Sequence, residues 1–424
     1  MEATADAPRP TPALVADRTF GPYFAGNLAS NIGTWCQQIT AAVVVFNVTG
    51  STFMVGLVGV SQFLPSLVLA PWTGAAADRF DRRRLLLRAQ ALAALAAGGL
   101  AVLTLTMGLG RFPAAWPVLA ATLVIGLCNA VSTPAQQALV PALVPPIDLD
   151  GALALNSVSY NLARAVGPAI GAAVLVAWGA GWAFGLNAVS YLIFVGALIL
   201  VSVPSIPKPV GRQSIWTGLR QLRTDPTLAV LLIGITALGF GIDPVLTLTP
   251  AIAQTLQDST FDNPDALVGL LISSFGAGAV LGTLIVARVR IRWGHLPVAA
   301  SGLGFVAVGA LGLAFSPVAW MALAFMVLGG VGFLFGVTSL TSAMHVRIPE
   351  EIRGRIMALW GVAFLGSRPV AAFVDGAVAD LASPQVATIV STSVVVVCLM
   401  VLIRLIRSGE PSPGGTATTT APQL

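Results

Sequence analysis

Long apolar stretches alternate with short polar segments along the whole chain of 424 residues. Each stretch has roughly the 20 residues or more that an α-helix needs to cross the hydrocarbon core of a bilayer. The stretches are apolar all round, which is typical of spanning helices rather than amphipathic surface helices. We therefore expect twelve spanning helices, at residues 20–46, 53–77, 85–107, 114–140, 152–178, 182–203, 227–255, 266–287, 296–315, 318–344, 354–379 and 384–406.

Basic residues gather in alternate connections between these stretches. If both termini are cytoplasmic, 19 of the 22 Lys and Arg residues fall in cytoplasmic segments. The remaining three are Arg111, in an outside loop, and Arg164 and Arg368, within helices. Because cytoplasmic loops carry the excess of basic residues, this bias predicts a multi-pass protein of the cell membrane with both termini in the cytoplasm.

The longest inside connection, residues 204–226, divides the predicted helices six and six. The two halves resemble each other weakly: Val-Gly-Leu opens both the second helix, at 55–57, and the eighth, at 268–270. Such duplicated halves are typical of transporters that alternate access around a central site. We expect a cytoplasmic tail at 1–19, a six-helix bundle at 20–203, a linker at 204–226, a second bundle at 227–407 and a disordered tail at 408–424.

The composition excludes several classes of protein. Hydrophobic residues make up 56% of the chain and charged residues only 9%, against about 25% in soluble domains. These proportions exclude a soluble enzyme and a nucleic-acid binder. The sequence also has no phosphate-binding G-x-x-x-x-G-K-[ST] loop, no H-E-x-x-H motif and no Cys/His cluster, so we expect no cofactor, no metal and no enzymatic activity.

The loop after the second predicted helix carries a recognisable motif, Gly-Ala-Ala-Ala-Asp-Arg-Phe-Asp-Arg-Arg-Arg, at residues 74–84. It resembles the G-x-x-x-D-R-x-G-R-R signature of the major facilitator superfamily and departs from it at Asp81, where the family has glycine. The resemblance implies an all-α fold of twelve helices and a conformational latch on the eleventh helix that holds the cytoplasmic side shut. The simpler alternative is a basic loop that only sets topology. The matching residues are Gly74, Asp78, Arg79, Arg82 and Arg83.

The fifth predicted helix carries a second motif, Gly167, Pro168 and Gly171. It looks like the antiporter signature of facilitator-superfamily exporters, although a kinked membrane helix alone can also carry Gly-Pro. Together with Gly-Thr-Trp at 33–35 and Asn-Leu-Ala-Arg at 161–164, these motifs resemble the branch that includes the enterobactin exporter and the macrolide efflux proteins. The resemblance spans most of the first half and weakens in the second.

Three charged residues lie deep within predicted helices: Arg164, Asp243 and Arg368. At ~1.5 Å per residue all three lie roughly 20–24 Å from the cytoplasmic face, and we infer one charged layer. Charges in the membrane are costly and usually functional, which makes the three residues candidates for proton coupling. The alternative is a structural ion pair that never titrates. With one acid and two arginines, the layer would keep a positive charge that suits an acidic substrate.

Polar stripes on four predicted helices suggest the lining of a substrate path, because polar groups at membrane depth must face protein or water. Hydrogen bonds between helices, without substrate contact, are the alternative for each of them. The candidate lining residues are Asn27, Asn31, Trp35, Gln38, Asn129, Ser132, Gln136, Asn156, Tyr160, Thr338 and Thr341.

The sequence therefore predicts a secondary transporter, a proton-coupled exporter (antiporter) of a small organic molecule such as a drug or a siderophore-like metabolite. Its expected partners are that small molecule, protons and the lipid bilayer, with no nucleic acid, and the expected state is a monomer. A symporter that imports its substrate, a lipid flippase of the same fold and a sensor without flux are the alternatives.

Overall fold

A computed structural model describes residues 9, 11–108, 115–201, 225–256, 263–348 and 350–408. At residues 11, 71, 74, 75, 77–79, 350–355 and 358 it describes the backbone alone. Nearly all of this part of the chain is helical, and it contains no strand.

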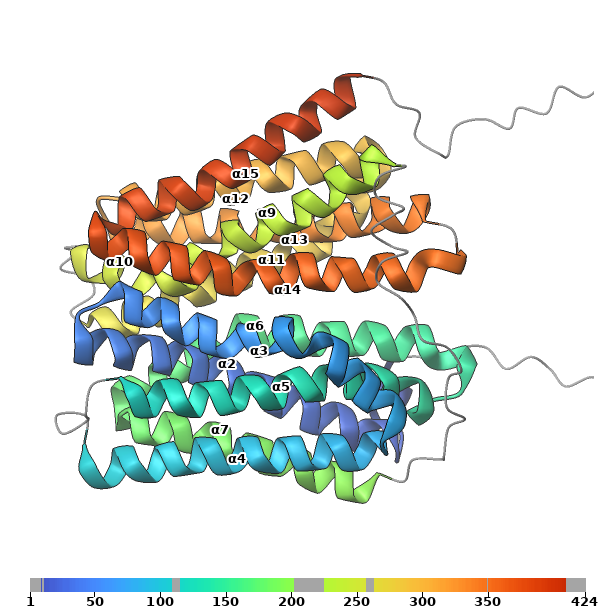
Figure 1. The fold of residues 1–424 in the computed structure, drawn as a ribbon, viewed down its shortest axis with the longest axis vertical. Helices are drawn as coiled ribbons and strands as arrows, with labels where there is room; N and C mark the ends of the chain where they lie inside the picture. The colour runs from blue at the N-terminus through green and yellow to red at the C-terminus, as the bar shows by residue number, and fades with distance from the viewer. Residues whose placement is uncertain are drawn as a thin grey trace, which may run out of the picture.

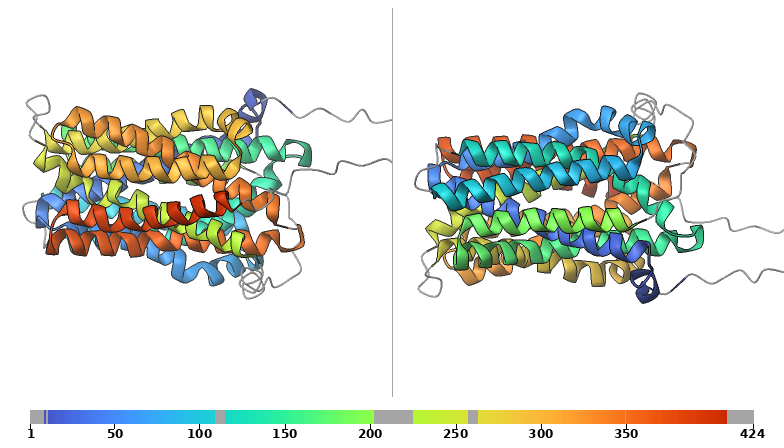
Figure 2. Two further views of the ribbon diagram at one scale, coloured as in Figure 1. Left: turned by 90° about the horizontal axis from the view of Figure 1, so that it is seen from above. Right: turned by 90° about the horizontal axis from the view of Figure 1, so that it is seen from below.

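The helices form two bundles, which lie one above the other in Figure 1. The first bundle contains α2 (Phe20–Thr49), α3 (Thr52–Arg79), α4 (Arg82–Met107), α5 (Trp116–Leu143), α6 (Leu149–Trp178) and α7 (Ala180–Leu200). The second contains α9 (Pro226–Thr247), α10 (Thr249–Thr255), α11 (Pro264–Trp293), α12 (His295–Phe315), α13 (Ala319–Arg347), α14 (Glu350–Leu381) and α15 (Pro384–Arg407). The long helices of both bundles run along one common direction (Figure 2).

Eleven of the described helices are long and apolar enough to cross a membrane. Helix α2 is not among them, because Asn27, Asn31 and Gln37 interrupt its apolar run, yet it has 30 residues and packs against α6 and α7. With α2 the described part of the chain holds twelve long helices, so the predicted all-α fold is confirmed. The linker at 204–226 and the tail at 408–424 lie largely outside the described residues, and of the tail at 1–19 residues 9 and 11–19 are described. Those domain limits stay predictions.

The stretch at 227–255 is not one helix, as expected, but two. Helix α9 ends at Thr247 and α10 begins at Thr249. Pro250 explains the break, because a proline has no N–H to donate and its ring displaces the carbonyl of the preceding turn.

Several helices begin at a polar residue whose side chain accepts a hydrogen bond from a free backbone N–H of the first turn. Asp81 does so for α4, accepting from the N–H of Arg84 at 2.8 Å. This explains the departure from the facilitator-superfamily motif, since an aspartate starts the helix at the position where the family has glycine. The other helices with such caps are α3 (Ser51), α9 (Asp225), α11 (Asn263) and α15 (Ser383).

The described part of the expected N-terminal tail is folded onto the first bundle. Arg9 bonds to Asp148 at 2.6 Å and to Asp17 at 2.9 Å, and Leu14 of α1 (Thr11–Val15) is buried. Burial opposes ionisation of Asp17, but hydrogen bonds from two backbone N–H groups and from Arg9 outweigh it and hold the pKa of Asp17 below its usual value. The segment therefore ties the start of α2 to the start of α6.

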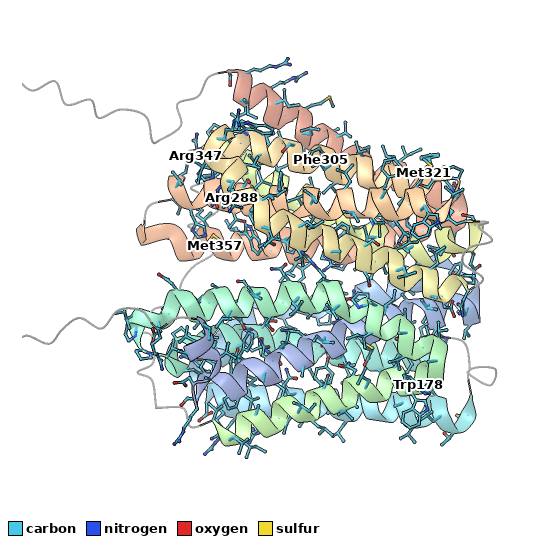
Figure 3. The ribbon with its side chains drawn as sticks, turned by 180° about the vertical axis from the view of Figure 1, so that it is seen from behind. Trp178, Arg288, Phe305, Met321, Arg347 and Met357 are labelled. Carbon is cyan, nitrogen blue, oxygen red and sulfur yellow. The ribbon has the colours of Figure 1, made fainter. Side chains whose placement is uncertain are left out.

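The two ends of the helices differ in charge. Arg288 and Arg347 lie at one end of the molecule and Trp178 at the other (Figure 3). We call these ends the basic side and the opposite side. Turns at Gly50, Gly108 and Gly179 mark the opposite side, and each of these glycines has a positive φ.

The two bundles meet at a seam near the opposite side, where α3 packs on α14 and α6 packs on α11. The seam is tight at the glycines of the two Val-Gly-Leu repeats. A Cβ on Gly56 would lie 2.3 Å from the carbonyl oxygen of Ala372, and one on Gly269 would lie 2.0 Å from the Cβ of Ala172. The weak repeat in the sequence therefore marks the places where one bundle touches the other.

Acidic residues close the same seam. Asp380 of α14 accepts hydrogen bonds from the hydroxyl of Ser51 and, at 2.7 Å, from the backbone N–H of Thr52. A carboxylate at the N-terminus of α3 is favoured by the free N–H groups and the helix dipole there. Asn47 also donates to Asp265 at 3.1 Å, so polar contacts from both bundles hold the opposite side shut.

Replacing Gly56 by valine should open this seam, because the added side chain has no room against Ala372. We expect spin-label distances between the opposite-side ends of α3 and α14 to lengthen in the Gly56→Val protein. Gly99→Val is the matched control, since a Cβ on Gly99 meets no atom within 4 Å. Unchanged distances in Gly56→Val would contradict the assignment of Gly56 to the seam.

Candidate functional site

Asp243 lies inside the second bundle, on α9. Its side chain is 2% exposed, and the hydroxyl of Thr247, one helical turn later, donates to it at 2.7 Å. Asp243 also borders a cavity of about 20 Å³, whose other lining residues include Gln38 and Phe63 of the first bundle. That volume holds about one water molecule, so Asp243 faces the other bundle across a small space.

Each of the two buried arginines contacts an aromatic ring of the other bundle. Arg368 of α14 has its guanidinium carbon 3.9 Å from the ring centre of Phe63, on α3. Arg164 of α6 has its guanidinium carbon 4.4 Å from the ring centre of Phe333, on α13. Each arginine of one bundle therefore contacts an aromatic face of the other, a cation–π arrangement that is stronger when the pair is desolvated.

The structure adds an acid that the sequence analysis missed, Asp375 on α14. It is fully buried, accepts a hydrogen bond from Ser391 of α15, and interacts electrostatically with Asp243. Asp375 follows Arg368 by seven residues, which is two helical turns, so the two residues lie on one face of the helix. That spacing is the feature of the sequence that indicates Asp375 as a neighbour of the charged layer. The layer therefore contains two acids as well as two arginines, and its net charge, with the acidic substrate expected from it, stays a prediction.

These ionisable groups interact without forming close ion pairs. Arg368 interacts electrostatically with both Asp243 and Arg164, which brings the three predicted charges together. In the described part of the chain, however, the salt bridges within 4.0 Å are those of Arg9 with Asp17 and Asp148. The buried layer therefore holds charges that are near one another but not neutralised by contact.

Tyr160 lies beside this layer, about one turn nearer the start of α6 than Arg164. It interacts electrostatically with both buried arginines and its ring lies 6.2 Å from that of Trp35, yet 42% of it is exposed. Tyr160 therefore joins the buried layer to the surface of the bundle.

The other predicted lining residues fall into two groups. Several of them bond between helices: Asn27 to Asn156 at 2.8 Å, Asn31 to Ser159 at 3.4 Å, and Thr341 to Trp360 at 3.0 Å. Ser132 is 2% exposed and bonds to Gln90 of α4, so it lies inside the first bundle and not beside the space between bundles. The partly exposed residues, some of which also form these bonds, are Asn31, Gln38, Asn129, Gln136, Asn156, Thr338 and Thr341.

The Gly-Pro motif of α6 lies where that helix contacts α2. A Cβ on Gly167 would lie 2.6 Å from the Cβ of Trp35, and one on Gly171 would lie 2.8 Å from the carbonyl oxygen of Cys36. These glycines allow close packing within the first bundle, and the adjacent Pro168 reaches α11 near Gly269.

The loop motif is described only in part. Arg82 donates to the carbonyl of Ala138 on α5, and Arg83 donates to the carbonyls of Leu198 and Ile199 at the end of α7. Arginines at a helix C-terminus satisfy its free carbonyl groups. At Gly74, Asp78 and Arg79 the structure describes the backbone alone, so the latch stays a prediction.

A family profile and several relatives of known function match nearly the whole chain. The profile of the family described as a transmembrane secretion effector matches residues 11–412. The enterobactin exporter EntS of Escherichia coli (strain UTI89 / UPEC) is 27% identical over 423 residues, covering 94% of this chain and 95% of the relative. EntS of Shigella flexneri is 27% identical over 420 residues, with the same coverage.

Solved structures share the fold at lower identity. The nucleoside transporter NupG superposes with a TM-score of 0.69 at 13% identity, covering 91% of this chain and 98% of that one. A bacterial homologue of the iron transporter ferroportin, in an inward-facing state, has a TM-score of 0.69 at 15% identity and covers 91% and 97%. An inward-facing bacterial homologue of the lysosomal transporter Spinster has a TM-score of 0.70 at 12% identity and covers 93% and 98%.

Asp375 and Asp148 should respond differently to removal of their charge. Asp375→Asn keeps the oxygen that accepts from Ser391 and removes a carboxyl group that has no ion-pair partner within 4.0 Å in the described part of the chain, so thermal stability in detergent should not fall. Asp148→Asn breaks the contact with Arg9 and should lower the midpoint of unfolding, followed by tryptophan fluorescence. A larger loss in Asp375→Asn than in Asp148→Asn would make Asp375 a structural residue.

Proposed function

This chain belongs to the transmembrane secretion effector family of the major facilitator superfamily, and on that premise we propose that it is a proton-coupled exporter. It is a multi-pass membrane transporter of the enterobactin-exporter branch that acts on a small molecule. The proposed cargo is a small organic molecule such as a drug or a siderophore-like metabolite, and the name of the EntS relatives supports the second of these.

The basic side is the proposed cytoplasmic side, with both termini there. The arginines on that side support this orientation, because cytoplasmic loops carry the excess of basic residues. With this orientation the cargo enters the space beside Tyr160 from the cytoplasm while the seam at Gly56 and Gly269 is shut. Export then requires the two bundles to rock about the buried charged layer, so that the seam opens and the basic side closes. The protein is proposed to do this as a monomer.

Asp243 is the proposed proton carrier, and one observation supports it above the others: a buried carboxyl group borders a cavity between the bundles without a close ion-pair partner. A carboxyl group there is subject to two opposing effects, since desolvation favours the neutral acid and nearby positive charge favours the carboxylate. Rocking of the bundles changes both effects. Arg164 and Arg368 adjust that balance, and Asp375 joins Asp243 as a second acid of the same site.

The proton hypothesis needs a cargo, which a screen in efflux-deficient cells with and without a protonophore would identify. In everted vesicles loaded with a pH dye, an antiporter releases protons when that cargo is added. Proton uptake on addition of the cargo would favour the symporter, and transport that persists without a proton gradient would favour the flippase.

Asp243→Asn should abolish uphill transport and spare downhill exchange, because the amide cannot carry a proton but still accepts from Thr247. The measurement is the accumulation ratio of the cargo in everted vesicles. Asp150→Asn, on the exposed start of α6, is the control and should behave as the unmodified protein. An unchanged accumulation ratio in Asp243→Asn would remove Asp243 from the mechanism.

The proposed latch consists of Gly74, Asp78, Arg79, Arg82 and Arg83, with Asp78 stabilising the state in which the cytoplasmic side is shut. Asp78→Asn should therefore populate the open basic side more fully. A cysteine at position 160, in a background without Cys36, Cys128 and Cys398, should react faster with a maleimide. Asp81→Asn is the matched control, since asparagine also caps a helix well. Equal reaction rates in the two variants would count against the latch.

A further inference from the structure

The two buried arginines carry hydrogen-bond donors that nothing in the described structure satisfies. The Nε and one terminal nitrogen of Arg368, together with the Nε of Arg164, have no hydrogen-bond partner. Both residues are more than nine-tenths buried, at 2% and 6% exposure. Buried polar groups in native proteins are nearly always paired, so each of these unpaired donors needs an explanation.

The nearby acids do not supply the missing acceptors. Asp243 accepts from Thr247 and Asp375 accepts from Ser391, and neither acid forms a salt bridge with Arg164 or Arg368 within 4.0 Å. The rings of Phe63 and Phe333 hold the guanidinium groups from the other bundle. A ring contacts the face of a guanidinium and leaves its N–H edge available. One terminal nitrogen of Arg164 donates to Asn161 at 3.2 Å and its Nε has no partner, whereas the unpaired edge of Arg368 matches a carboxylate in a bidentate fork.

The two arginines also repel each other. They come from different bundles, on α6 and α14, and are close enough to interact electrostatically. An anion placed between them would offset their mutual repulsion and satisfy N–H donors from both bundles at once. Tyr160, which interacts with both arginines and is partly exposed, lies beside the place where such an anion would bind.

We propose that Arg164 and Arg368 together bind one anionic group of the transported molecule, a carboxylate attached to an aromatic or apolar body. The aromatic part of the site, Phe63 and Phe333 with Trp35 beside Tyr160, suits such a body. The inference rests on the proposed function in taking the bound anion to be the cargo. Because the anion contacts both bundles, binding would favour a conformation in which they are drawn together.

Benzoate is the probe for this site, and benzamide is the matched neutral ligand of almost the same shape. Binding is measured by calorimetry on the purified full chain in detergent, without any ion gradient. We expect benzoate to bind and benzamide to bind at least about tenfold more weakly, the factor that charge-assisted hydrogen bonds contribute. Equal affinity for the two ligands, or no binding of benzoate, would overturn the proposal.

Variants test whether benzoate binds at Arg164 and Arg368. Arg164→Gln and Arg368→Gln should each weaken benzoate binding about tenfold or more, and Arg→Lys at either position should restore part of it. Arg290→Gln is the control, because Arg290 bonds to Ser342 and lies outside the charged layer. Full benzoate affinity in Arg164→Gln and Arg368→Gln would overturn the assignment.

A measurement on the unmodified protein covers the case in which a variant does not fold. Phenylglyoxal modifies arginine side chains, and mass spectrometry locates the modified residues. Benzoate should slow modification of Arg164 and Arg368 and leave Arg290 unaffected, whereas equal rates with and without benzoate would overturn the proposal.

The anion site and the proposed function can fail separately. Charge-selective binding without proton-driven export would contradict the proposed function alone, and proton-driven export of a neutral cargo would contradict the anion site alone.

Discussion

The cost of holding ionised side chains away from water governs the central part of this protein. No water is available in the hydrocarbon core to solvate a charge, so each buried charge must face protein or an internal cavity. The chain meets this constraint by covering Arg164 and Arg368 each with an aromatic ring of the opposite bundle and by burying Asp243 and Asp375 in the second bundle beside them. The bundles therefore depend on each other for the solvation of their charges, and a movement of one changes the environment of the charges in both.

The contrast with the N-terminal segment shows what a purely structural ion pair looks like here. Arg9 makes close contacts with Asp17 and Asp148, and these join the start of α2 to the start of α6 within one bundle. The central charges instead keep donors and acceptors unsatisfied. Unsatisfied buried groups weaken a fold, and their retention at the interface between bundles is typical of a site that exchanges partners during function.

The opposite side is closed by close packing and by polar contacts between the bundles. At the opposite side, glycines let the helices approach closely and Asp380 binds the N-terminus of α3 across the seam. This contact does not depend on a loop motif, because an acid at a helix N-terminus is favourable on its own. The proposed latch at Asp78 would play the corresponding part on the basic side.

The sequence by itself determined the number of long helices, most of their limits, the basic side and the presence of three charged residues within helices. Each of these follows from local properties of the chain: the length of an apolar run, the polar residue that caps a helix, and a fixed rise per residue. Only the tertiary structure decided which side chains meet, as in the pairing of Arg368 with Phe63, the nearness of Asp375 to Asp243 and the burial of Ser132 inside one bundle. These contacts depend on the rotation of each helix about its axis and on how the two bundles meet at the seam. Both are set by packing between residues far apart in the chain.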